Sequence, residues 1–205
     1  MSTFFTFDGI DGTGKSTQSD LFCAWLSELG CDVSRCRDPG STPLGESLRK
    51  TLLHDRQIEI GRRAETLIYM AARAQLVEET IRPALLAGKT VVSDRFLLAN
   101  VAYQAYGGEL PVDAVRGLGQ FATEGLSPDC TFLLDMNVST ALSRLGHDAD
   151  RLEGRGVDYF SRVRQGFLVE AQRHNDRIWV IDANGDVDEI QSRIREISKR
   201  FLAAT

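Results

Sequence analysis

The sequence has little of what marks secreted, zinc-binding or membrane-spanning proteins. Its 205 residues include 4 cysteines and 3 histidines, and no two cysteines are spaced as CxxC. This composition predicts neither a disulfide framework nor a Cys/His metal site. No segment approaches the roughly 18 consecutive apolar residues of a membrane span. Residues 1–12 lack the positive region and apolar stretch of a signal peptide. We therefore expect a cytoplasmic protein whose thiols are reduced and mostly buried.

Basic segments are also missing. The chain carries 24 Lys+Arg against 29 Asp+Glu, a formal net charge of −5, and it has no basic run or tail. This balance argues against a surface that binds nucleic acid or a membrane, although a small anionic ligand remains compatible with it. The hydrophobic fraction of 42% and charged fraction of 26% are those of a globular chain. We expect one domain over residues 1–205.

Short apolar runs alternate along the chain with longer helical segments, a pattern typical of a parallel sheet covered by helices. We expect strands near 4–7, 32–35, 90–93, 131–134 and 178–181. We expect helices near 15–29, 62–86, 112–123, 138–145, 159–174 and 187–202. The spacing of Leu21, Trp25 and Leu29 predicts the apolar face of the first helix. The apolar face of the last helix is predicted at Ile190, Ile194, Ile197 and Phe201.

A glycine-rich motif follows the first predicted strand and opens the first helix. Residues 9–16, GIDGTGKS, match G-x-x-x-x-G-K-[ST] in full. The glycines let main-chain N–H groups point at a phosphate, and the helix N-terminus adds partial positive charge. Lys15 would reach the β- and γ-phosphates, and the Ser16 hydroxyl would bind Mg²⁺. The fold class is therefore predicted to be α/β, a three-layer P-loop NTPase-type sandwich with about five parallel strands. The predicted nucleotide-binding residues are Gly9, Gly12, Thr13, Gly14, Lys15, Ser16 and Thr17.

Asp94 and Arg95 directly follow the third predicted strand, at the carboxyl end where ligands of open α/β sheets bind. Arg95 could bind a phosphate, and Asp94 could hold Mg²⁺ through water or position Arg95. A structural Asp–Arg ion pair is the alternative. The chain has no Asn/Thr-Lys-x-Asp run for reading guanine. Its length favours a kinase for a small molecule, which needs a second anion site and a lid.

Six segments together resemble the thymidylate kinase family almost end to end. In order they are GIDGTGKS (9–16), RDPGST (37–42), YMAAR (69–73), DRF (94–96), AYQ (102–104) and DRLE (150–153). The resemblance implies ATP-dependent phosphorylation of dTMP to dTDP, with Mg²⁺ held at Ser16 and Asp94. It also implies a homodimer, for which helices 62–86 and 112–123 are candidate faces. Another nucleoside or nucleoside-monophosphate kinase, or a non-catalytic nucleotide-binding module, are the alternative functions.

The resemblance also implies roles for the phosphate and sugar contacts. Asp11 would accept a hydrogen bond from the sugar 3′-hydroxyl, and Tyr103 would lie under the sugar and disfavour a 2′-hydroxyl. Arg49 and Arg95 would hold the acceptor phosphate in line with the donor. The alternatives are that Arg49 is an ordinary solvated residue on an amphipathic stretch and that Tyr103 is a packing residue.

For the base, the resemblance implies that Tyr69 stacks on thymine, Arg73 donates to a thymine carbonyl, and Asn100 reads the base edge. Tyr69 as a core aromatic and Arg73 as a surface arginine are the alternatives. The chain departs from the family pattern at Asp38 for Glu, Ser41 for Gly, Tyr69 for Phe, Ala99 for Ser and Ala105 for Gly. These departures leave the base preference open and do not touch the phosphate-binding residues.

A lid is expected near residues 144–157, where the chain becomes polar and glycine-containing. The P-loop has no arginine at its variable positions, which resembles family members whose catalytic arginine lies in the lid. Arg144, Arg151 and Arg155 are the candidates, with Arg151 the first choice, and a solvated charged loop is the alternative. The predicted catalytic residues are Lys15, Asp94, Arg95 and Arg151.

Overall fold

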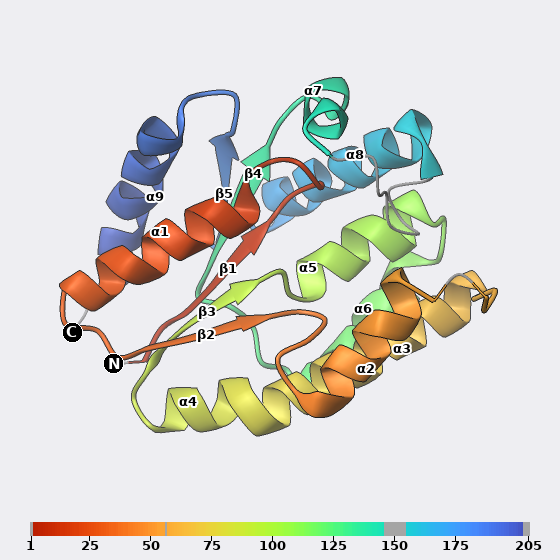
Figure 1. Cartoon of the computed structure of the whole chain (residues 1–205), viewed down its shortest axis with the longest axis horizontal. Coiled ribbons are helices and arrows are strands. Elements are labelled where there is room, and N and C mark those ends of the chain that lie inside the picture. Colours follow the sequence, from red (N-terminus) through yellow and green to blue (C-terminus); the bar gives the residue numbers. More distant parts are fainter. Residues whose placement is uncertain (1, 56, 146–154, 203–205) are drawn as a thin grey trace.

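A computed structural model describes residues 2–55, 57–145 and 155–202. These residues form a five-stranded sheet in the order β2-β3-β1-β4-β5, and every strand pair is parallel (Figure 1). The strands are β1 (Phe4–Asp8), β2 (Val33–Arg37), β3 (Thr90–Asp94), β4 (Cys130–Asp135) and β5 (Ile178–Asp182). The predicted α/β class and parallel sheet are confirmed. The segment 146–154, which includes Arg151 and most of the expected lid, lies outside the described residues.

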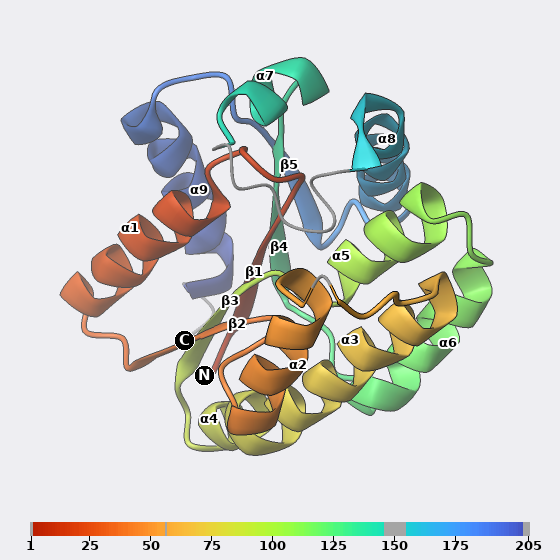
Figure 2. The ribbon, with the colours of Figure 1, turned by 45° about the vertical axis from the view of Figure 1, so that its right-hand side comes forward.

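Helices cover both faces of the sheet. Figures 1 and 2 show α1 (Lys15–Glu28) and α9 (Val187–Leu202) together on one side. The other side carries α3 (Arg62–Leu76), the π-helical segment η1 (Val77–Ile81), α4 (Arg82–Leu86), α5 (Leu97–Asn100), η2 (Val101–Gly107, also π-helical), α6 (Val112–Thr123) and α8 (Val157–Arg173). The remaining helices are α2 (Pro43–Leu53), which packs on α3, and α7 (Val138–Ser143), which packs on α8. No helix within the described ranges is long and apolar enough to cross a bilayer.

The central strand β1 is buried along its whole length because it has neighbours on both sides and helices on both faces. Phe5 packs edge-on against Phe22 of α1, with ring centroids 5.1 Å apart. Phe4 points to the opposite face and meets Phe96 at 5.0 Å. This alternation, with period two, places aromatic side chains in both layers of the core. It also brings the last residue of the strand to the edge where the P-loop begins.

The predicted apolar face of α1 is wrong by one position. Phe22 and Leu26 are the fully buried apolar residues, while Leu29 is 57% exposed. Phe22 fills the space between α1 and the sheet, and Trp25 lies partly buried at the side, under the Arg195 guanidinium of α9. The predicted buried stripe of α9 is confirmed at its three isoleucines.

Two helical segments were not predicted from the sequence. The first is α2, which begins after Thr42, whose hydroxyl accepts a hydrogen bond from the Gly45 N–H. The second is the run of α5 and η2 that follows Arg95. The predicted helix 62–86 is helical throughout, but π-helical turns interrupt it before Pro83. Proline has no N–H to continue an α-helical ladder, which favours a change of hydrogen bonding there.

Candidate active site

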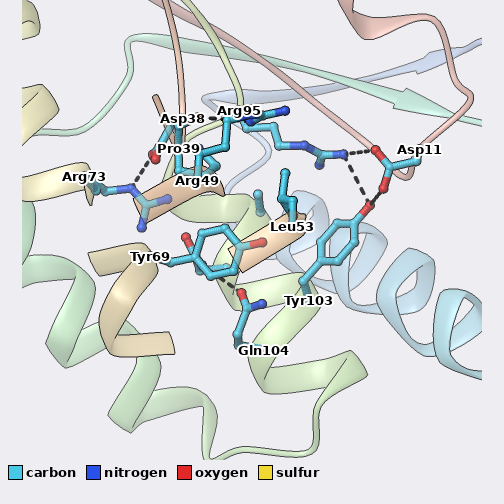
Figure 3. Close-up of a pocket in the computed structure, with 12 residues that line it drawn as sticks. Asp11, Asp38, Pro39, Arg49, Leu53, Tyr69, Arg73, Arg95, Tyr103 and Gln104 are labelled. Atoms are coloured by element: carbon cyan, nitrogen blue, oxygen red, sulfur yellow. Dashed lines mark hydrogen bonds and ion pairs between the residues drawn. The ribbon is translucent and has the colours of Figure 1, made fainter. Parts of the chain in front are cut away.

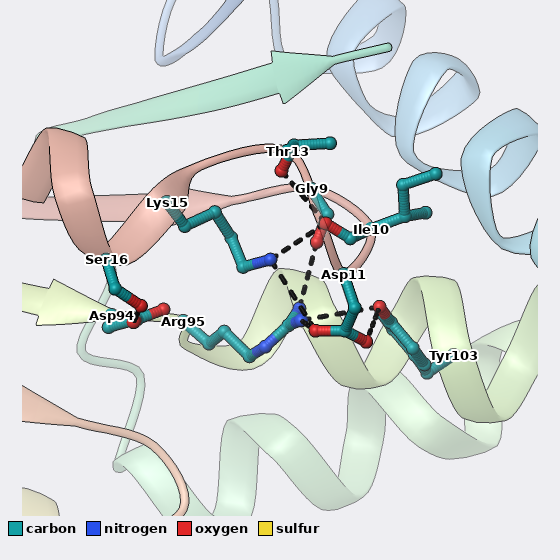
Figure 4. Close-up of polar contacts among 9 residues, drawn as sticks. All are labelled: Gly9, Ile10, Asp11, Thr13, Lys15, Ser16, Asp94, Arg95 and Tyr103. Carbon is teal, nitrogen blue, oxygen red and sulfur yellow. Dashed lines mark hydrogen bonds and ion pairs between the residues drawn. The ribbon is translucent and has the colours of Figure 1, made fainter. Parts of the chain in front are cut away.

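The P-loop joins β1 to α1 and curls over the carboxyl edge of the sheet (Figure 4). Gly12 has φ 85°, and a Cβ there would lie 2.0 Å from the carbonyl oxygen of Ala141 in α7. Only glycine fits this close approach. Within the loop, the Lys15 ammonium and the Thr13 hydroxyl both donate to the Ile10 carbonyl, at 2.8 and 2.9 Å. Lys15 thus lies folded over the loop, only 6% exposed, at the opening of the helix.

Asp94 and Arg95 come to this same edge because β3 is hydrogen-bonded to β1, with Asp94 in register with Phe7. Arg95 has φ 69°, the left-handed region that costs an L-residue about 1 kcal/mol or more. Its side chain points to the P-loop and donates to the Gly9 carbonyl at 3.0 Å and to Asp11 at 2.5 Å (Figure 4). The two predicted anion-binding elements therefore face each other, with Arg95 in contact with both.

A cavity of about 420 Å³ lies in front of the P-loop. It is lined by Asp11, Gly12, Gly14, Lys15, Ser16, Thr17, Arg37, Asp38, Arg49, Asp94, Arg95, Arg144 and Leu145. Five of these side chains are cationic and three are carboxylates, so the lining carries an excess of positive charge although the whole chain is acidic. Arg37 was missed by sequence reasoning. Its place in the motif RDPGST was the available clue.

A second, narrower cavity of about 80 Å³ opens beside the first (Figure 3). All seven residues predicted to bind substrate line it: Asp11, Arg49, Tyr69, Arg73, Arg95, Asn100 and Tyr103. It is also lined by Asp38, Pro39, Leu53, Ala99 and Gln104, which sequence reasoning did not assign to the site. The position of Gln104 in the AYQ motif was a usable clue. The two cavities share Asp11, Asp38, Arg49 and Arg95, so a ligand in one would meet a ligand in the other.

A buried ion pair fixes one wall of the narrow cavity. The Arg73 Nε donates to Asp38 at 2.6 Å, and both side chains are at most 1% exposed. Burial raises the pKa of Asp38, and the Arg73 guanidinium opposes that change. Removing either partner would leave a buried charge without its counter-ion. Arg73 is therefore held in one position on the pocket wall, and it is not a surface arginine.

Asp11, Arg95 and Tyr103 form a compact cluster at the junction of the two cavities (Figures 3 and 4). The Tyr103 hydroxyl donates to Asp11 at 2.9 Å, and the Arg95 guanidinium lies 5.0 Å from the centre of the Tyr103 ring. Burial would raise the pKa of Asp11, but Arg95 and Lys15 outweigh it and hold the pKa well below its usual range. Burial also lowers the pKa of Lys15 to about 8. Asp11 is thus an ionised acceptor at neutral pH.

Ser16 and Asp94 present oxygen atoms to the larger cavity. The Ser16 hydroxyl donates to an Asp94 carboxylate oxygen at 2.8 Å. Within the described ranges, no three or more His, Cys, Asp and Glu side chains gather in a way that could hold a metal. Mg²⁺ usually takes only one or two protein oxygens and completes its shell with waters and substrate phosphates. A hydroxyl and a carboxylate at this spacing fit that requirement.

Comparison with known proteins agrees with the family resemblance seen in the sequence motifs. The family model described as thymidylate kinase matches residues 7–194. The chain belongs to the thymidylate kinase family. It is 47% identical over 192 residues to a thymidylate kinase of Rhodopirellula baltica, covering 94% of this chain and 78% of that protein. It is 42% identical over 201 residues to one from Kosmotoga olearia, covering 97% and 95%. The crystal structure of thymidylate kinase from Ehrlichia chaffeensis superposes with a TM-score of 0.80 at 31% identity, covering 97% and 98%.

Of the three arginines expected in a lid, Arg144 and Arg155 lie in the described residues, and they lie in different places. Arg144 lines the larger cavity in front of the P-loop. Arg155 lies elsewhere, donating to Glu65 of α3 and to the Tyr159 hydroxyl, with its guanidinium over the Tyr159 ring. Arg151 lies outside the described residues, so its catalytic role stays a prediction.

Proposed function

We propose that this chain transfers the γ-phosphoryl group of ATP to dTMP, giving ADP and dTDP. The observation that supports this most is the sharing of Asp11 and Arg95 between the P-loop cavity and the narrow cavity. A donor phosphate chain on the P-loop and an acceptor phosphate beside Arg95 would meet at that junction. Membership of the thymidylate kinase family supports the same pair of substrates.

In this reaction an oxygen of the acceptor phosphate attacks the γ-phosphorus, and the bond from that phosphorus to the β–γ bridging oxygen breaks. The acceptor oxygen is already ionised, so no general base is needed. Lys15 and Arg95 stabilise the charge that spreads over the transferring group, and Arg49 helps to position the acceptor. Ser16 and Asp94 would hold Mg²⁺, which would neutralise the donor phosphates. A lid arginine, with Arg151 the first choice, would complete the charge stabilisation.

The narrow cavity carries the predicted base contacts. Tyr69 lies across it in a position to stack on a pyrimidine, with Arg73 on one wall and Gln104 at its edge (Figure 3). Because Asp38 already engages Arg73, the shorter carboxylate at this position still reaches the arginine. This supports thymine recognition despite the departures from the family pattern.

A substrate panel tests the function. Release of ADP would be followed with dTMP, dUMP, dCMP, dGMP and thymidine, and kcat/KM compared. We expect dTMP to be preferred. A higher kcat/KM for another acceptor would make the chain a different nucleotide kinase, and no turnover with any acceptor would make it a nucleotide-binding module.

We further propose that the enzyme is a single-domain homodimer. The neighbouring helices α3 and α6 expose large apolar side chains, among them Leu67 (53%) and Phe121 (86%). Exposure of this kind on adjacent helices is typical of a protein–protein contact surface.

We also propose a cytoplasmic location for the protein. Its four cysteines are free thiols, which supports this location.

A further inference from the structure

A series of hydrogen bonds runs from Arg155, two residues before α8, to the wall of the narrow cavity. Arg155 donates to one carboxylate oxygen of Glu65, and the Gln104 side-chain amide donates to the other at 3.0 Å. The carbonyl oxygen of the Gln104 side chain then accepts from the Asn100 amide at 2.7 Å. Glu65, Gln104 and Asn100 are all at most 3% exposed, and the last two line the pocket.

The Glu65 carboxylate sets which way the Gln104 and Asn100 side-chain amides are turned. An ionised carboxylate can only accept hydrogen bonds, so Gln104 must turn its NH₂ group toward Glu65. Its carbonyl oxygen then faces Asn100, which in turn must present its own NH₂ group. Each amide is left with one possible orientation. With neutral partners only, both amides could rotate by 180° and keep the same number of hydrogen bonds.

The orientation of these amides decides which atom of Asn100 is free to contact a ligand. The Asn100 NH₂ group is engaged, and its Oδ1 atom is buried with no hydrogen-bond partner within the described part of the chain. A buried carbonyl oxygen without a donor is costly, so the site is complementary to a ligand N–H group. Thymine and uracil carry a hydrogen on N3. Cytosine has a lone pair there, which would face the Asn100 oxygen.

We propose that Glu65, held by Arg155, is a positioning residue that sets the base specificity of the site. By orienting the Gln104 and Asn100 amides it presents an acceptor to N3 of the base, which favours thymine and uracil over cytosine. The inference rests on the proposed function. Glu65 itself contacts no substrate, because two side chains stand between it and the base.

The test uses Glu65→Gln, which keeps the shape of the side chain but allows it to donate as well as accept. Dissociation constants for dTMP, dUMP and dCMP would be measured by calorimetry, alongside kcat and KM. We expect the preference for dUMP over dCMP to fall roughly tenfold or more, because both amides can now rotate. The preference for dTMP over dUMP should not change, since it depends on the 5-methyl group. Changes should appear in KM more than in kcat.

Two further variants separate specificity from general damage. Glu65→Asp remains a pure acceptor and should retain the dUMP preference better than Glu65→Gln. Glu170→Gln alters another buried carboxylate, which accepts hydrogen bonds from Arg116 and Tyr106 away from the pocket, and should leave all the preferences unchanged. An unaltered dUMP-to-dCMP ratio in folded Glu65→Gln would overturn the proposal, as would an equal loss in Glu170→Gln.

If Glu65→Gln does not fold, the wild-type protein supplies the measurement. Lowering the pH toward the pKa of cytosine N3 protonates that atom and makes it a donor. The affinity for dCMP should then rise relative to that for dUMP, and parallel changes for the two nucleotides would overturn the proposal. Because these affinities do not require turnover, they test the inference even if dTMP phosphorylation itself is absent.

Discussion

Arg95 leaves β3 in the left-handed region and contacts Gly9, Asp11 and Tyr103. The cost of this conformation is offset by the charged contacts that the side chain makes. Its guanidinium lies where both cavities meet, and in the proposed reaction it would contact the acceptor phosphate and the transferring group together. This position gives a direct prediction.

Replacing Arg95 by Ala should lower kcat by about 10²-fold to 10³-fold or more, since one main source of transition-state charge stabilisation is removed. The fold should persist, as judged by circular dichroism and thermal unfolding. Arg116→Ala is a matched control, because that arginine pairs with Glu170 far from the P-loop. Near-normal kcat in Arg95→Ala would remove this residue from the mechanism.

Asp8 ends β1 just before the P-loop and is fully buried. Neither of its carboxylate oxygens has a hydrogen-bond partner in the described ranges. Burial raises its pKa to about 8, although Arg95 and Lys15 act in the opposite direction. In the unfolded chain this carboxyl releases its proton near pH 4. Between about pH 4 and 8, unfolding therefore releases one proton from Asp8, and its contribution to stability falls as the pH rises.

The prediction is that Asp8→Asn removes this dependence. The free energy of unfolding of the wild type should fall relative to the variant by up to about 1.4 kcal/mol per pH unit across that window. Urea unfolding at pH 5, 6.5 and 8 would measure it. Asp135→Asn, at the end of β4, is the control. Parallel pH profiles for wild type and Asp8→Asn would show that Asp8 is ionised throughout.

The seven residues that the sequence predicts to bind substrate come together in the structure. They line one cavity, although only Asp11 and Arg95 lie in the P-loop and DRF motifs and the other five were expected from the family resemblance alone. Glu65 was not predicted because it does not line the cavity and lies in none of the family's motifs. A clue did exist, since Glu65, Tyr69 and Arg73 are spaced by four and share one face of α3.

Among the elements, the P-loop is fixed by its packing against α7. The Cβ of an alanine at Gly12 would collide with the main chain of Ala141, which cannot move like a flexible side chain. The loop and α7 would have to separate, and the phosphate-binding N–H groups would lose their common direction. The conformation of the P-loop therefore depends on both the loop itself and α7.

Gly12→Ala should weaken ATP binding at least tenfold and lower the thermal midpoint, because the loop must shift to accommodate the methyl group. Calorimetry with ATP and thermal unfolding would measure the two effects. Gly117→Ala in α6 is the matched control, since a Cβ added there would meet nothing within 4 Å, and it should be neutral or stabilising. Unchanged ATP affinity in Gly12→Ala would contradict the claim that close packing of Gly12 against Ala141 holds the P-loop in its ATP-binding conformation.

The elements that sequence reasoning placed well have clear apolar periodicity or a strong boundary, as in α6 and α9. The predictions were wrong or missing where tertiary packing, and not local sequence pattern, determines the structure. The face of α1 is set by aromatic packing of Phe22 against β1, which the four-residue spacing of Leu21, Trp25 and Leu29 did not reveal. The helical run α5–η2 is largely buried, so it lacks an amphipathic pattern.

For the whole molecule, the exposed apolar surface on α3 and α6 leads to a prediction about assembly. Phe121→Asp should weaken self-association about tenfold or more, because an apolar ring leaves the contact and a charge enters it. Sedimentation velocity over a concentration series would measure this. Leu29→Asp, which alters an exposed apolar residue next to α1, should leave association unchanged. A monomeric wild type, or equal effects of both variants, would contradict the proposed dimer face.

Two cavities meet at Asp11 and Arg95, and we propose that two phosphates react directly there. The most direct test is inhibition by one molecule that joins adenosine and thymidine through five phosphates. We expect this compound to bind far more tightly than either nucleotide and to compete with both ATP and dTMP. Competition with only one of them would show that the two cavities do not form a continuous site.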